Sequence, residues 1–223
     1  MDSRQTRSVI KVRPARKAKT LRVKKGLHDI TEYYTGLSGF GANIVGSNKN
    51  TTYGEISLSG LVALADTFKR FAPLSTFDKA DRNYIDLGSG IGKTVVGMAM
   101  LVPEIQCNGI ETVYDRHEAA MSARKRIPSN SLASRIHFRH GSFLEPPYTF
   151  KSACWIFISN LLFSSDLQAS LAKHLETECP AKAVIICSKA LPFSGNTFEC
   201  IDTGIAIPMS WSATSTCYVY RRR

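Results

Sequence analysis

A glycine-rich segment is the part of the chain best suited to hold a ligand. It reads Asp86-Leu87-Gly88-Ser89-Gly90-Ile91-Gly92 and lies between a short apolar run at 83–87 and a helical pattern at 93–101. Glycines let the backbone turn tightly and approach a ligand closely, where a side chain would obstruct it. The segment therefore predicts a ligand-binding turn between a strand and a helix.

Three kinds of glycine-rich turn could account for this segment, and single residues distinguish between them. A triphosphate-binding loop requires GxxxxGK[ST], and Leu87 stands where its first glycine must be. A dinucleotide fingerprint requires GxGxxG, and Lys93 stands at its last position. An acid two residues before GxGxG is instead the glycine motif of methyltransferases. We retain this interpretation and keep an ATPase as a remote alternative.

A second acid, Glu111, ends the next apolar run, 25 residues after Asp86. In such sheets an acid at the carboxyl end of the second strand accepts hydrogen bonds from both ribose hydroxyls of a cofactor. A solvated loop glutamate is the alternative, and Glu111 alone leaves both open. The glycine turn upstream favours the cofactor role.

The segment Glu145-Pro146-Pro147-Tyr148 looks like the NPPY signature of DNA adenine methyltransferases. In those enzymes the signature follows the fourth strand, whereas here the segment precedes the run predicted as the fourth strand. We therefore interpret it as a proline-rich turn.

Alternating apolar runs and helical patterns predict the elements that position these residues. We expect strands at 83–87, 105–111, 135–140, 153–159 and 183–188, and helices at 55–71, 93–101, 115–127 and 166–176. Two extended runs, 197–207 and 214–220, have no helix between them. The pattern predicts an α/β fold of the Rossmann-like methyltransferase class, with a mostly parallel sheet that ends in an antiparallel hairpin.

The charge of the chain is concentrated at its start and suggests three regions. Residues 1–25 contain ten lysines or arginines and one acid, so the remaining 19 basic and 17 acidic residues nearly balance. We expect a disordered basic tail at 1–27, a loop and helical cap at 28–75, and a cofactor-binding core at 76–223. The glycine-rich stretch 35–52 suggests a loop or lid.

The six cysteines form no CxxC pair or metal-like spacing with the five histidines, so we expect no metal and a reduced, intracellular protein. We also expect no membrane span and no secretory signal.

Several motifs, in order, resemble the non-SET histone lysine methyltransferases named for disruption of telomeric silencing. The resemblance covers about 50–218. It comprises Tyr53-Gly54-Glu55, the glycine turn, Glu111, Gly141-Ser142-Phe143-Leu144, Trp155 to Phe163, Ser188-Lys189 with Pro192-Phe193, and Ser210-Trp211 with Tyr218. Three positions depart from the family: Ser142 replaces an aspartate, Ser159-Asn160 replaces an Asn pair, and Ile56 replaces a threonine.

The resemblance implies S-adenosylmethionine as cofactor and assigns residues to it. The implied cofactor-binding residues are Tyr53, Gly54, Glu55, Asp86, Gly88, Ser89, Gly90, Gly92, Lys93, Glu111, Ser142 and Phe143. It also implies an apolar channel for the target lysine, walled by Tyr218, Trp211 and Phe163, with Asn160 orienting the amine or the cofactor. An apolar channel favours the neutral amine that methyl transfer requires.

The implied function is methylation of a lysine of histone H-three in nucleosomes, by a monomer in the nucleus. Basic residues of the tail would contact DNA phosphates, namely Arg13, Arg16, Lys17, Lys19, Arg22, Lys24 and Lys25. A nuclear-import signal, a solubilising tail and a mitochondrial presequence are alternatives for this tail. For the whole chain, the alternatives are a methyltransferase acting on RNA or another protein, and a chromatin-binding pseudoenzyme.

Overall fold

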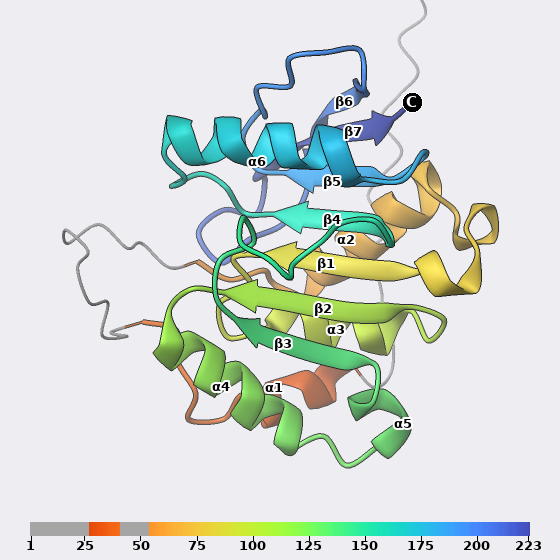
Figure 1. Cartoon of the computed structure of the whole chain (residues 1–223). Coiled ribbons are helices and arrows are strands. Elements are labelled where there is room, and N and C mark those ends of the chain that lie inside the picture. Colours follow the sequence, from red (N-terminus) through yellow and green to blue (C-terminus); the bar gives the residue numbers. More distant parts are fainter. Residues whose placement is uncertain (1–26, 41–53) are drawn as a thin grey trace, which may run out of the picture.

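A seven-stranded sheet forms the centre of the computed structural model, which describes residues 27–40 and 54–223 (Figure 1). The strand order is β3-β2-β1-β4-β5-β7-β6. The strands are β1 (Asn83–Leu87), β2 (Gln106–Glu111), β3 (Ile136–His140), β4 (Ala153–Ile158), β5 (Val184–Cys187), β6 (Phe198–Ala206) and β7 (Thr216–Arg222). The first five are parallel, and β7 runs antiparallel to both β5 and β6. This confirms the predicted fold class.

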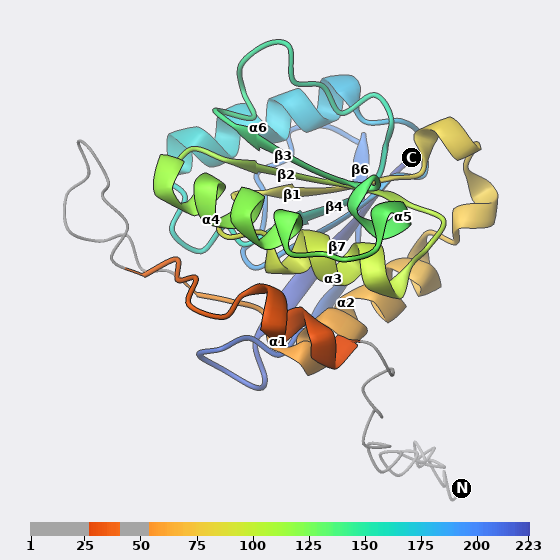
Figure 2. The same cartoon turned by 90° about the horizontal axis from the view of Figure 1, so that it is seen from below.

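Helices cover both faces of the sheet (Figure 2). They are α1 (Ile30–Tyr33), α2 (Leu58–Phe71), α3 (Lys93–Leu101), α4 (Tyr114–Lys125), α5 (Asn130–Ala133) and α6 (Ser165–Glu178), with short 3-10 turns at Leu27–Asp29, Leu74–Thr76 and Lys79–Asp81. Helix α6 lies on the face opposite α2 and α3. The predicted boundaries of α3 and β1 match the structure, and the short helices α1 and α5 were not predicted.

Helix α2 begins three residues later than its apolar periodicity predicts. The Ser57 hydroxyl accepts a hydrogen bond from the backbone N–H of Gly60 at 3.0 Å and so caps the helix. Glu55 and Ile56 therefore remain in extended chain, where Ile56 forms a β-bridge with Met209. As a result, Glu55 lies beside the carboxyl edge of the sheet rather than on a helix.

Two hydrophobic clusters hold the layers together, one on each face of the sheet. On the face of α2 and α3, the Trp155 ring stacks on Phe68 with centroids 5.1 Å apart, and its indole N–H donates to the carbonyl of Ala72 at 2.8 Å. Both side chains are fully buried. Helix α2, which belongs to the region expected as a cap, thus packs into the same cluster as the strands.

Five of the six cysteines are buried and belong to this packing. Burial raises the pKa of Cys154 and of Cys179 to about 12, so these thiols stay neutral. Among the described residues there is no group of three His, Cys, Asp or Glu side chains placed to hold a metal ion. Within the same residues, no helix has the length and apolar character needed to cross a membrane.

Candidate cofactor and acceptor site

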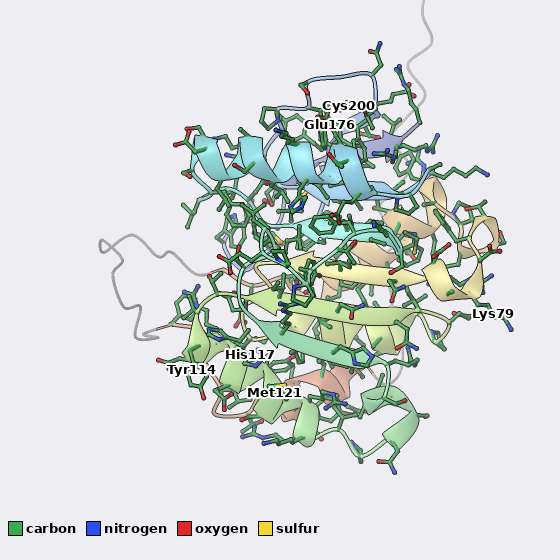
Figure 3. All side chains as sticks on the ribbon, in the orientation of Figure 1. Lys79, Tyr114, His117, Met121, Glu176 and Cys200 are labelled. Carbon is green, nitrogen blue, oxygen red and sulfur yellow. The ribbon has the colours of Figure 1, made fainter. Side chains whose placement is uncertain are left out.

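The glycine turn follows β1 at the edge where the carboxyl ends of the parallel strands meet, on the left in Figure 1. Gly88, Gly90 and Gly92 all have positive φ angles, of 80°, 55° and 83°. A side chain is strained in this backbone region, and a Cβ at Gly92 would also lie 2.3 Å from the Phe138 ring. The predicted strand–turn–helix arrangement is confirmed. Figure 3 shows Tyr114 and His117 on α4 beside this edge.

Glu111 is buried at the end of β2 and holds the glycine turn in place. Its carboxylate accepts hydrogen bonds from the backbone N–H groups of Gly90 and Val113, each at 2.8 Å. A carboxylate has about four lone-pair directions. The Thr112 hydroxyl also contacts the Glu111 carboxylate at 3.5 Å, and Glu111 keeps acceptor capacity for a ribose hydroxyl in the cavity that it lines.

The cavity beside Glu111 has a volume of about 320 Å³ and suits an adenosine. Its lining includes Ile110, Phe143 and Phe163, and the last two rings stack with centroids 5.8 Å apart. Apolar and aromatic surfaces of this kind bind the faces of a flat base. Ser142 lies here too, and its hydroxyl accepts a hydrogen bond from the Leu144 N–H at 3.1 Å.

A second cavity continues from Gly88 and Gly90 toward charged side chains that suit an amino-acid end. It is lined by Asp86, Glu55 and Lys93, and the Lys93 ammonium forms an ion pair with the Glu55 carboxylate. Carboxylates and an ammonium group are the partners that an α-amino and an α-carboxyl group require. The polar groups of the two cavities thus fit the adenosine end and the amino-acid end of S-adenosylmethionine.

Ser89 contributes backbone rather than its hydroxyl to this cavity. The Ser89 hydroxyl is buried without a hydrogen-bonding partner among the described residues, and it lies against Gly109 of β2. A Cβ at Gly109 would be 2.7 Å from that oxygen and 2.9 Å from the Phe138 ring. Sequence reasoning missed Gly109, because the contact that requires a glycine there comes from a different strand and turn.

Asp86 is buried beneath the second cavity and has an unusual pKa. Its pKa is raised from 3.8 to about 7, chiefly by burial; the hydrogen bond donated by the Thr94 hydroxyl lowers it, and the Glu111 charge raises it by a smaller amount. Other ionisable groups near Asp86 are Tyr84, Tyr148, Lys93 and Glu55. The carboxyl therefore gains or loses its proton near neutral pH.

We expect Asp86 to make the protein less stable as the pH rises. Between about pH 4 and pH 7 the folded protein retains a proton that the unfolded chain has released, so the free energy of unfolding falls through this window and levels off above it. The loss is roughly 2–3 kcal/mol between pH 5 and pH 8. Urea unfolding of the wild type and of Asp86→Asn at both pH values tests this. Equal pH dependence in the two proteins would contradict it.

A third cavity opens beside the cofactor cleft and suits the methyl acceptor. It has a volume of about 640 Å³, and its lining residues are Phe40, Gly54, Ser159, Leu161, Leu162, Ser210 and Trp211. We call it the acceptor pocket. None of the described residues that line it carries a charge, and Phe40, Leu161, Leu162 and Trp211 are exposed large apolar side chains.

The wall between the acceptor pocket and the cofactor cleft is built from two bonded segments. The Ser210 N–H donates to the Glu55 carbonyl at 2.7 Å, and the Glu55 N–H donates to the Ser210 hydroxyl at 3.0 Å. The Trp211 ring lies against Gly54 so closely that a Cβ there would be 1.9 Å from it. The structure thus places Trp211 beside the cofactor residues.

The structure places the Asn160 side chain, which was expected to orient the amine or the cofactor, in a fully buried position. Its amide group donates to Gln168 Oε1 at 3.0 Å and to the Lys189 carbonyl at 2.9 Å, and its oxygen accepts from the Lys189 N–H at 2.8 Å. Asn160 therefore joins the loop after β4 to the loop after β5. It positions these loops and contacts neither the cofactor cleft nor the acceptor pocket.

Two of the three predicted channel walls also lie elsewhere. Phe163 lines the adenosine cavity, where its ring is 3.5 Å from the position that a Cβ on Gly88 would occupy, and is absent from the acceptor pocket lining. Tyr218 lies on β7 opposite Cys187, half-buried against the cluster under α6, and is not among the residues that line the acceptor pocket. Tyr53 and the seven basic residues at 13–25 lie outside the described residues.

We expect Asn160→Ala to destabilise the fold without direct loss of a substrate contact. The change leaves the Lys189 backbone groups and the Gln168 carbonyl without their partner in a buried region. The expected loss is about 2–4 kcal/mol of the free energy of unfolding, measured by urea denaturation. Asn130→Ala, at an exposed position in α5, is the control. If Asn160→Ala lowers the free energy of unfolding no more than the control does, Asn160 does not hold the two loops together.

Comparison with protein families decides which methyltransferases this chain resembles. The model of the histone methylation protein DOT1 family matches residues 45–206. The chain belongs to the DOT1 family. The matched range contains the glycine turn, Glu111 and the loop that begins at Ser159. Comparison with curated proteins found no match.

Solved structures share the fold of this DOT1 family member. An RNA methyltransferase from Salinibacter ruber in complex with S-adenosyl-L-homocysteine superposes with a TM-score of 0.51 at 18% identity, covering 71% of this chain and 89% of that one. TrmN from Thermus thermophilus superposes with a TM-score of 0.54 at 15% identity, covering 72% and 48%. The family match and the fitting cleft identify the chain as a methyltransferase that uses S-adenosylmethionine.

Proposed function

We propose that the chain transfers a methyl group from S-adenosylmethionine to a lysine side chain of histone H-three in nucleosomes, in the nucleus. The observation that carries the proposal is the uncharged, apolar acceptor pocket, which shares Gly54, Ser159 and Leu162 with the adenosine cavity of the cofactor cleft. Membership of a histone methylation family supports the same substrate.

The chemistry of the pocket favours a lysine over a nucleic acid as acceptor. A lysine in water has a pKa near 10.4, and apolar surroundings lower it because they disfavour the charged form. The Trp211 ring and Leu161 offer such surroundings and also pack against the alkyl part of the side chain. An RNA strand would instead require cationic groups for its phosphates, and the described lining has none.

The basic residues at 13–25 are proposed to hold nucleosomal DNA. Each lysine or arginine that neutralises a phosphate releases a counterion, so affinity falls steeply as salt rises. Activity on nucleosomes is therefore expected to depend on salt far more than affinity for S-adenosylmethionine does.

Tritiated S-adenosylmethionine with three substrates in parallel tests the proposal: nucleosomes, free histones and total RNA. We expect label on histone H-three in nucleosomes, and none with Gly90→Arg, because an arginine at this positive φ would fill the cofactor turn. Label on RNA alone would refute the substrate and leave the enzyme class intact. A protein that binds no S-adenosylmethionine and labels nothing would be a binding module without catalysis.

A further inference from the structure

One polar side chain stands where all three cavities meet. Ser159 and Gly54 line the adenosine cavity, the amino-acid cavity and the acceptor pocket. Gly54 has no side chain, so the Ser159 hydroxyl is the side-chain group that these two positions present at the junction. It forms no hydrogen bond with any residue that the structure describes, and it is only partly buried.

The backbone around Ser159 is held on both sides. Ile158, the last residue of β4, accepts a hydrogen bond from the Ser188 N–H at 3.1 Å through its carbonyl. The next residue after Ser159 is the buried Asn160, whose side chain is bonded to Lys189 and Gln168. Ser159 thus lies between two anchored residues, and its hydroxyl is presented at a fixed place.

The neighbouring polar groups already have partners. The Ser210 hydroxyl accepts from the Glu55 N–H, and the Asp86 carboxylate accepts from the Thr94 hydroxyl. Glu55 itself is paired with Lys93. Ser159 is the uncharged polar side chain at the junction whose hydroxyl has no hydrogen-bonding partner among the described residues, so its oxygen is available to an incoming group.

We propose that the Ser159 hydroxyl orients the methyl acceptor. Its oxygen accepts a hydrogen bond from an N–H of the neutral target amine, which turns the nitrogen lone pair toward the methyl carbon. The nitrogen then forms the new N–C bond as the S–C bond breaks, and the electron pair of that bond stays on sulfur. The product ammonium releases its extra proton to water. This inference rests on the proposed function in taking the acceptor to be an amine.

Replacing Ser159 by alanine tests the role in catalysis. We expect kcat to fall by about 10- to 100-fold, the effect of one lost orienting hydrogen bond, while the Kd of S-adenosylmethionine changes by less than about twofold. Ser159→Thr keeps a hydroxyl and should restore part of the rate. Ser170→Ala, on an exposed part of α6, is the control and should leave the rate unchanged. An unchanged kcat, or a loss confined to cofactor affinity, would overturn the proposal.

A measurement that does not depend on turnover separates this inference from the proposed function. Ser159→Cys is made in a Cys200→Ser background, since Cys200, on β6 (Figure 3), is the exposed one of the native cysteines. We expect S-adenosylmethionine to slow alkylation of the new thiol by iodoacetamide, and nucleosomes to slow it further. If S-adenosylmethionine slows the alkylation but nucleosomes, histones and RNA do not slow it further, Ser159 does not contact the acceptor and the proposal is overturned. Slowing by RNA alone would overturn the histone substrate and support the placement of Ser159.

Discussion

Replacing Glu111 by alanine is expected to weaken S-adenosylmethionine binding by about 100-fold or more and to abolish methyl transfer at ordinary cofactor concentrations. Two losses combine. The Gly90 and Val113 N–H groups lose the carboxylate that holds the glycine turn, and the ribose loses its acceptor. Each charge-assisted hydrogen bond is worth roughly 1.5–3 kcal/mol, and every 1.4 kcal/mol is tenfold in Kd.

Equilibrium dialysis with tritiated S-adenosylmethionine measures this effect. Glu118→Ala removes an exposed carboxylate from the neighbouring helix α4 and serves as the control. Glu111→Gln keeps the shape of the side chain and one acceptor oxygen, so we expect an intermediate affinity and a folded protein. If Glu111→Ala and Glu118→Ala bind equally well, Glu111 has no role in holding the cofactor.

A second large effect is expected from Gly54→Val. A Cβ at this position would lie 1.9 Å and 2.2 Å from two carbons of the Trp211 ring, which must then leave its place. Gly54 also lines both parts of the cofactor cleft and the acceptor pocket. Displacement of a reacting group by about 1 Å can cost 100-fold in rate. We therefore expect kcat/KM on nucleosomes to fall by at least about 100-fold.

Two further variants show whether the contact with Trp211 causes the loss. Gly204→Ala adds a methyl group on β6 where the nearest atom would be 3.9 Å away, and it should retain full activity. In the double variant Gly54→Ala with Trp211→Ala, the added methyl group no longer meets the indole ring. We expect this variant to bind S-adenosylmethionine as the wild type does, while its activity on nucleosomes stays low because the Trp211 wall is missing. A fully active Gly54→Val would show that Trp211 does not wall the acceptor site.

The parts of the site that could be predicted from the sequence depend on local patterns. The glycine turn follows from residue types that only a tight strand–helix turn requires, and Glu111 follows from its position at the end of the next strand. Strands β4 and β5 could be predicted because these buried parallel strands are continuous apolar runs. The start of α2 could not be predicted from periodicity, since the Ser57 cap rather than the apolar pattern determines it.

The parts that could not be predicted depend on contacts between distant segments. Ser159 and Asn160 are adjacent, and at the end of a strand adjacent side chains point in opposite directions. The sequence does not say which one is buried, because the answer depends on Lys189 and Gln168, which pair with Asn160. The roles of Gly109 and Phe163 likewise depend on which side chains the fold brings beside them.

The most direct test of the proposed chemistry is to identify the atom that receives the methyl group. Nucleosomes are incubated with the protein and tritiated S-adenosylmethionine, histone H-three is isolated, and its acid hydrolysate is separated into amino acids. We predict that the label elutes with methylated lysine and that Gly90→Arg gives none. Label in methylated arginine, or label recovered only from nucleic acid, would contradict the proposed transfer to lysine.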